Sequence, residues 1–378
     1  MSFAKLPILR HGLMVRDEEI LPDSAVNARI EKVRTLMQAN NVEVVLVYGD
    51  PTKGGPACYL TNYPCFGLGR RATVVLGRKE GPFLFTAEPS RNLPRVRRFT
   101  TCDIEKTRQF LSAACDRAKK LSEGKPMGLV NFANLPHGVV KDTQGLSGSE
   151  LRDMTEEVVS LVAAKDESSL RAMKQAVALA AKGLSSLKGL ATPGKDLWQL
   201  AADVDHQLRL LGCEDTNILL GCSAGGPVRP GYPSRIRLSA GDSLVAYVGA
   251  QYARQWGVVG TTFSIGSNRG NLDAMLSTLS EIQKKALFRV KAGMTLGDVE
   301  AALFDIGREA GVSLSRDLPV VAGVGFDLSE YPVNAENRVE RDMVLQAALC
   351  VDVGREFSAM LVNLLQVTGE GGVWLTGG

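Results

Sequence analysis

The chain has 378 residues, of which 45% are hydrophobic and 22% are charged. This is the composition of an average globular protein, and the length suggests two or three domains. Lysine and arginine number 44 against 41 aspartates and glutamates, so the net charge is only +3. Such a balance predicts neither a nucleic-acid partner nor a membrane partner.

The seven cysteines include no CxxC pair. An odd number without such a pair argues against a disulfide framework and against a structural zinc site. The N-terminus carries Lys5, Arg10 and His11 and lacks the apolar core of a signal peptide. No stretch approaches the roughly 18 apolar residues that cross a bilayer. We therefore expect a cytoplasmic protein.

The first part of the chain alternates helical and strand-like patterns. Apolar residues at helical spacing predict amphipathic helices over residues 26–40 and 105–120. Short apolar runs predict buried strands over residues 42–48, 72–76, 82–85 and 127–131. The segment Gly-Arg-Lys-Glu-Gly at 77–81 is typical of a turn between two of these strands. These patterns predict an α/β domain that spans residues 1–160.

The second domain is predicted over residues 161–378, after a loop-like stretch at 141–150. It opens with a long helix from about 166 to 189, for which Asp166 is the expected N-cap. The same criteria predict further elements: helices over 196–211, 271–291 and 297–311, strands over 217–221, 243–248 and 258–264, and a strand-rich tail from Pro319.

Two familiar catalytic patterns fail on physical grounds. Gly221–Gly225 matches the GxSxG nucleophile elbow, which needs a helix after the serine and a histidine later in the chain. Pro227 follows instead, and all three histidines lie at or before position 206. Three isolated histidines also exclude a HExxH zinc site.

Several segments resemble the sequence motifs of one known protein family, and they occur in the same order along the chain. Gly241–Ala250 is similar to a strand written G-D-x-x-x-x-D-x-G-A, and Gly323–Pro332 is similar to G-H-G-I-G-L-x-x-H-E-x-P. The other matching segments are Tyr59–Tyr63, Ala164–Glu167, Pro193–Gly194, Trp256–Phe263, Lys291–Thr295 and Val367–Thr376. Together they resemble the creatinase/aminopeptidase P family, also called the pita-bread family. The resemblance implies an α/β (α+β) fold, with a creatinase-like N-terminal domain and a C-terminal pita-bread domain.

The resemblance also implies a pair of divalent metal ions held by two aspartates, a histidine and two glutamates. In this chain those positions fall, in order, on Tyr247, Val258, Val324, Asp352 and either Val362 or Asn363. A single carboxylate among apolar neighbours cannot hold two cations. We therefore predict no metal and no cofactor.

Creatinase is a metal-free branch of the same family, and Phe66–Arg71 resembles its substrate-binding segment. There an arginine holds the substrate carboxylate of the neighbouring subunit, so the resemblance implies a homodimer and makes Arg70 a candidate anion-binding residue. Creatine itself is disfavoured, because Pro230 stands at the catalytic histidine position and Gly260 at the guanidinium-binding glutamate position.

These observations predict a metal-independent hydrolase or lyase that acts at a C–N bond of a small, carboxylate-bearing molecule. The candidate catalytic residues are Asp352, Tyr247 and Ser329, and the candidate substrate-binding residues are Arg70, Trp256, Arg229 and Glu330. Burial is expected to raise the pKa of Asp352 toward the range of a general acid or base. Tyr247 would donate a hydrogen bond to a developing oxyanion.

Each candidate also has a structural interpretation: a buried hydrogen-bonded carboxylate for Asp352, core packing for Tyr247 and Trp256, a loop contact for Glu330 and a charged strand start for Arg70. If the structural interpretations hold, the chain is a non-catalytic binding module of the pita-bread fold. A Xaa-Pro-type metallopeptidase is the third alternative, and it is disfavoured by the missing ligands.

Overall fold

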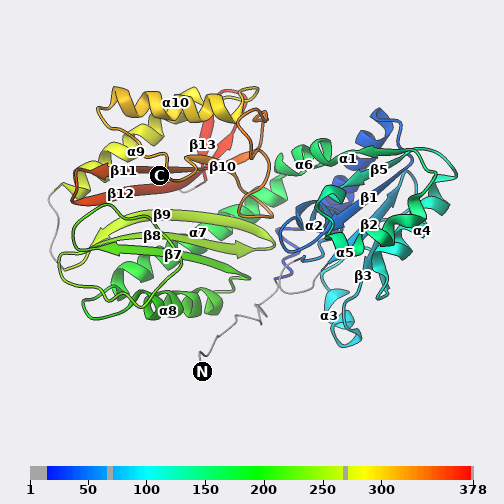
Figure 1. Ribbon diagram of the computed structural model, residues 1–378, viewed down its shortest axis with the longest axis horizontal. Coiled ribbons are helices and arrows are strands. Elements are labelled where there is room, and N and C mark those ends of the chain that lie inside the picture. Colours follow the sequence, from blue (N-terminus) through cyan, green and yellow to red (C-terminus); the bar gives the residue numbers. More distant parts are fainter. Residues whose placement is uncertain (1–14, 66–70, 267–270, 376–378) are drawn as a thin grey trace. The chain divides into compact units, whose positions relative to one another are not determined.

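The computed structural model describes residues 15–65, 71–266 and 271–375 (Figure 1). These residues form two compact units: unit 1 is Arg16–Val162, and unit 2 is Val15 together with residues 163–375. The division into an N-terminal domain of residues 1–160 and a C-terminal domain of residues 161–378 stays a prediction. Among the described residues, no helix combines the length and the apolar character that crossing a bilayer requires.

Unit 1 is built on a six-stranded mixed sheet in the order β4-β3-β2-β1-β5-β6. Its strands are β1 (Val44–Gly49), β2 (Ala72–Gly77), β3 (Phe83–Thr86), β4 (Asp103–Lys106), β5 (Met127–Val130) and β6 (Leu151–Asp153). Its α-helices are α1 (Asp23–Ala39), α2 (Gly55–Thr61), α3 (Leu93–Val96), α4 (Phe110–Ser122), α5 (His137–Val140) and α6 (Thr155–Ala163). Short 3-10 helices lie at Ser90–Asn92, Phe132–Asn134 and Lys141–Leu146. The central strands β1 and β2 are buried along their whole length, as their valine-rich sequences predict.

Unit 2 contains a seven-stranded sheet in the order β10-β11-β12-β9-β8-β7, with β13 paired to β12. Its strands are β7 (Thr216–Ser223), β8 (Ser243–Tyr252), β9 (Gln255–Ser264), β10 (Val321–Gly323), β11 (Val344–Val353), β12 (Phe357–Val367) and β13 (Gly372–Trp374). Its helices are α7 (Glu167–Leu190), α8 (Leu197–Leu210), α9 (Leu272–Arg289) and α10 (Leu296–Glu309) (Figure 1).

The long helices of unit 2 begin where the sequence supplies a capping side chain. The Asp166 carboxylate accepts a hydrogen bond from the Ser169 backbone N–H at 2.7 Å, which confirms the predicted N-cap of α7. Asp196 caps α8 in the same way, through the Gln199 N–H at 2.7 Å. Thr295 opens α10 with a reciprocal capping box. Each cap fixes where its helix starts relative to the sheet.

Most predicted elements are confirmed, and the exceptions lie in unit 1. The helix predicted over 105–120 is wrong at its start, because residues 103–106 form β4 in parallel pairing with β3, and α4 begins only at Phe110. The helices α2, α3, α5 and α6 and the strand β6 were not predicted. Helix α2 is seven residues long, too short to show a helical apolar period, and all of its residues are buried.

Candidate functional site

A row of directly paired residues crosses the middle of the unit 2 sheet. Tyr247 pairs with Gly260, Gly260 with Val362, and Val362 with Ala348. Directly opposed residues of antiparallel strands point to the same face, and Val258 lies two residues before Gly260 on β9, so it shares that face. We call this surface the site face, defined by Tyr247, Val258, Gly260, Ala348 and Val362.

Helices cover the opposite face of the sheet. A Cβ added to Gly257 would lie 2.2 Å from the Val177 backbone nitrogen, so α7 lies directly against the side of β9 that Val258 does not share. On β12, the Asn363 side-chain amide donates to Gln283 Oε1 on α9 at 2.7 Å. Of the two alternatives for the last ligand position, Val362 therefore lies on the site face and Asn363 on the helix face.

The site face is packed as a hydrophobic core. Val258, Val324, Ala348 and Val362 belong to one buried cluster, and the exposed fraction of each side chain lies between 0% and 7%. The backbone N–H of Val324 donates to the Val344 carbonyl at 3.0 Å, which fixes the segment after β10 against β11. The side chains thus fill the region in which the ligand positions meet.

Tyr247 and Trp256 both contribute to this packing. The Tyr247 hydroxyl donates to Gln346 Oε1 at 3.2 Å, and burial raises the pKa of Tyr247 above its ordinary value. The phenol therefore stays protonated at neutral pH. Trp256 is 7% exposed, belongs to the same core cluster, and donates its backbone N–H to the Gly325 carbonyl at 2.7 Å. Their roles in catalysis and substrate binding stay predictions.

Asp352 lies at the far end of the β11–β12 pair, outside the row of directly paired residues that crosses the sheet. It pairs with Ser358, four residues beyond Ala348 on β11, a separation of about 13 Å at ~3.3 Å per residue. Its two carboxylate oxygens accept hydrogen bonds from Arg229 Nη1 at 2.6 Å and Nη2 at 2.9 Å. The hydrogen bond from Arg229, followed by that from Ser358, lowers the pKa of Asp352. The predicted upward shift is wrong, because the carboxylate is exposed and paired with a cation.

Arg229 is likewise paired through both of its terminal nitrogens. Besides Asp352, its guanidinium donates to Ser358 Oγ at 2.8 Å, Ser315 Oγ at 2.9 Å and Asp317 Oδ2 at 2.9 Å. The hydrogen bond to Asp352 is the main cause of a raised pKa for Arg229. Two carboxylates, those of Asp352 and Asp317, already pair with this cation, and its binding to a substrate anion stays a prediction. Its observed role is to join the segment after β7 to the end of β11.

Glu330 and Lys165 form a buried ion pair beneath the segment that carries Val324. The Lys165 ammonium lies against Glu330 Oε1, and Glu330 Oε2 accepts the Phe326 backbone N–H at 2.9 Å. Both oxygens of Glu330 therefore have partners in the described residues, which is the loop contact of its structural interpretation, and its contact with a substrate stays a prediction. Ser329, the remaining catalytic candidate, is exposed. Arg70 lies outside the described residues.

We expect the Arg229–Asp352 pair to contribute to stability only above the acid range. Because the folded-state pKa of Asp352 is lowered, its contribution is present above the unfolded-state value near ~3.9 and is lost as pH falls through the folded-state value. Asp352→Asn should cost less than about 1 kcal/mol at pH 7, because the carboxylate is 36% exposed and screened by solvent. Urea unfolding of both proteins between pH 2 and 8 measures this, and a cost that grows toward acid pH would contradict it.

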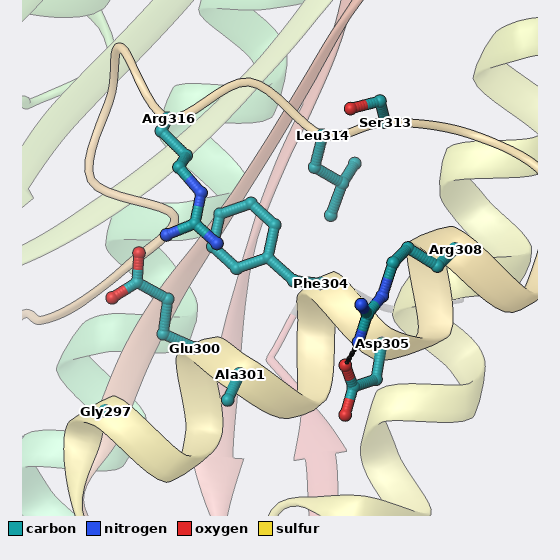
Figure 2. A pocket seen from close by; sticks show the side chains of 9 residues that line it. All are labelled: Gly297, Glu300, Ala301, Phe304, Asp305, Arg308, Ser313, Leu314 and Arg316. Atoms are coloured by element: carbon teal, nitrogen blue, oxygen red, sulfur yellow. Dashed lines mark hydrogen bonds and ion pairs between the residues drawn. The ribbon is translucent and has the colours of Figure 1, made fainter.

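A polar hollow of about 410 Å³ lies beside α10, away from the site face. Figure 2 shows Arg316 over the Phe304 ring, 4.1 Å from its centroid, and the ion pair between Arg308 and Asp305. None of the predicted site residues lines it. Among residues 15–65, 71–266 and 271–375, no three His, Cys, Asp or Glu side chains are placed to hold a metal ion.

Known proteins resemble this chain over most of its length. The Xaa-Pro dipeptidase of Pyrococcus horikoshii is 23% identical over 316 residues, which cover 81% of this chain and 84% of that protein. The crystal structure of the prolidase from Pyrococcus horikoshii OT3 superposes with a TM-score of 0.74 at 20% identity, over 93% of this chain and 98% of that one. The crystal structure of the X-Pro aminopeptidase from Thermotoga maritima superposes with a TM-score of 0.79 at 17% identity. The match covers 92% of this chain and 97% of that one.

These similarities overturn the function predicted from the sequence. That prediction was a metal-independent hydrolase or lyase of a small molecule, with a non-catalytic module as the first alternative. The relatives are named as dipeptidases, prolidases and aminopeptidases, and these names favour the Xaa-Pro peptidase alternative that was placed last. That prediction rested on the apolar residues at the metal-ligand positions, and its reaction type was taken from the creatinase branch.

The predicted fold class is confirmed. The two units and the helix-covered sheet of unit 2 match solved two-domain pita-bread structures along more than nine-tenths of the chain. The sequence profile of the family described as "Metallopeptidase family M24" matches residues 171–373, more than half of the chain. The chain therefore belongs to metallopeptidase family M24, as its resemblance to the creatinase/aminopeptidase P proteins predicted.

Proposed function

We propose that this member of a hydrolase family recognises short peptides of the Xaa-Pro type. The observation that carries the proposal is the similarity to a Xaa-Pro dipeptidase over 81% of this chain, together with the family match over residues 171–373. A Xaa-Pro dipeptide is also a small molecule with a free carboxylate, which is compatible with the predicted carboxylate-bearing ligand.

A dipeptide of this kind presents a carboxylate, an ammonium and a proline ring without a backbone N–H. Its carboxylate needs a cationic partner, for which arginine has the best geometry. Arg229 is occupied by Asp352 and Asp317. Arg70 stays the candidate for this role, and with it stay the predictions of a homodimer and of a cytoplasmic location.

Isothermal titration with Ala-Pro and Gly-Pro tests this proposal, with Ala-Gly as the control. We expect saturable binding of the proline dipeptides, at least about tenfold tighter than that of Ala-Gly, a difference of roughly 1.4 kcal/mol. Chromatography of the same solutions measures whether either peptide is cleaved. Absence of both binding and cleavage for every dipeptide would overturn the proposal. An Arg70→Ala variant that binds as tightly as the parent protein would remove that residue from it.

A further inference from the structure

We infer that the site face of unit 2 does not hold the pair of metal ions that the family name implies, and that it is a packed apolar core instead. This inference does not depend on the proposed peptide ligand. It follows from the donor atoms, the strand register and the packing of the described residues.

The donor atoms do not suit a metal ion. The divalent cations that such a metal pair would contain bind to carboxylate oxygen and imidazole nitrogen. The side chains that meet on the site face are Tyr247, Val258, Val324, Ala348 and Val362. Four are hydrocarbon, and the fifth is a phenol whose hydroxyl donates to Gln346 Oε1 at 3.2 Å. None of these groups can neutralise a cation.

The strand register offers no alternative ligand set. A shift of one residue would exchange Val362 for Asn363 and Ala348 for Leu349, and it would bring side chains from the helix face to the site face. Leu349 belongs to the core under α9 and α10, and Asn363 already donates to Gln283. Asp352 lies four residues beyond Ala348 on β11, a separation of about 13 Å at ~3.3 Å per residue. Its carboxylate is paired with the positive charge of Arg229. No neighbouring register therefore supplies two or more carboxylates.

The packing leaves no room in the middle of the row. A Cβ added to Gly260 would lie 2.9 Å from Val362 Cγ2 and 3.0 Å from Met360 Cε, both shorter than ordinary carbon contacts. Val258 and Val324 are completely buried. Hydrated ions would have to enter a space that aliphatic side chains already fill, without gaining ligands that replace their water.

Metal analysis of the full chain tests the inference. Protein purified without chelator is assayed for bound metal and titrated with Mn²⁺, Co²⁺ and Zn²⁺ in a calorimeter, in the absence of peptide. We expect below about 0.1 equivalent of metal per chain and no rise in Tm at 1 mM metal, because an ion that does not bind cannot stabilise the fold. Two equivalents bound per chain, with a Tm that chelator lowers, would overturn the inference.

Two variants locate any metal that is found. Val362→Ala should lower Tm by the same several degrees with and without chelator, since it removes only packing. Asp352→Asn should leave metal content unchanged. If Val362→Ala instead lowers metal content in parallel with Tm, the face is a metal site and the inference fails. Peptide titration of chelator-treated protein reports separately on the proposed function, so either idea can fail without the other.

Discussion

Glu214→Ala is expected to lower the free energy of unfolding by about 3–5 kcal/mol, because it leaves a buried arginine without its counter-charge. The side chains of Glu214 and Arg254 are 0% and 3% exposed. The carboxylate of Glu214 accepts Arg254 Nη1 at 2.8 Å, the Arg254 backbone N–H at 2.6 Å and the Val15 backbone N–H at 2.7 Å. Removal of the carboxylate therefore takes the acceptor from three donors, of which the two on Arg254 are buried. Urea unfolding measures the loss.

Two controls separate this effect from a general loss of surface charge. Glu214→Gln keeps an oxygen acceptor and the side-chain volume, so it should cost less than the alanine variant. Glu281 forms an ion pair with Lys284 in which both side chains are about 60% exposed, and Glu281→Ala should change stability by less than about 0.5 kcal/mol. Equal losses for Glu214→Ala and Glu281→Ala would contradict the buried-pair explanation.

Lys165→Met is expected to be the second most damaging substitution, again at about 3–5 kcal/mol, since it strands the Glu330 carboxylate in the core. The Lys165 side chain is 0% exposed and that of Glu330 is 9% exposed. The pair joins the start of α7 to the segment that carries Val324. A methionine matches the volume of the lysine stem but provides no charge.

The double variant Lys165→Met/Glu330→Gln is the informative comparison. A neutral amide at position 330 can still accept the Phe326 N–H, which the native Glu330 accepts at 2.9 Å. With no charge left unpaired, the double variant should be more stable than Lys165→Met alone, so the two substitutions will not be additive. Strict additivity in urea unfolding would show that the charge pair itself contributes little.

Much of the fold could be predicted from local sequence patterns. The Asp166 cap, the apolar period of the long helix and the strand-like segments at 243–248 and 258–264 are local signals, and each is confirmed. The failure at residues 103–106 has a different cause. Those residues form an edge strand only because β3 lies beside them, and a pairing partner distant in sequence leaves no local signal.

The candidate site was predicted less well, because motif spacing does not determine which residues oppose one another. The motif resemblance placed the first glutamate position on Asp352, yet the pairing of Ala348 with Val362 shows that Asp352 lies four residue pairs too far along β11. Its partner Arg229 is 123 residues away in the chain. A raised pKa was expected from the apolar sequence around Asp352, and that sequence contains no sign of the arginine that lowers it.

The Glu214–Arg254 pair had no sequence signal at all. Arg254 lies with Ala253 in the two-residue turn between β8 and β9, and both have positive φ angles, of 64° and 45°. Asparagine and glycine are the usual residues at such positions, so an arginine there does not suggest a buried ion pair. Only the folded hairpin directs its side chain inward to Glu214.

The attachment of Val15 has a consequence for the topology of the chain. Arg254 Nη2 donates to the Val15 carbonyl at 2.8 Å, so Val15 is fastened to unit 2 by both its N–H and its C=O. The next residues, from Arg16 to Val162, form unit 1, and the chain then returns to unit 2. Within the described residues, unit 2 thus includes a residue on each side of the segment Arg16–Val162. A single cut at Ala163 would leave Val15, on the N-terminal fragment, as a hydrogen-bonding partner of Glu214 and Arg254 on the other.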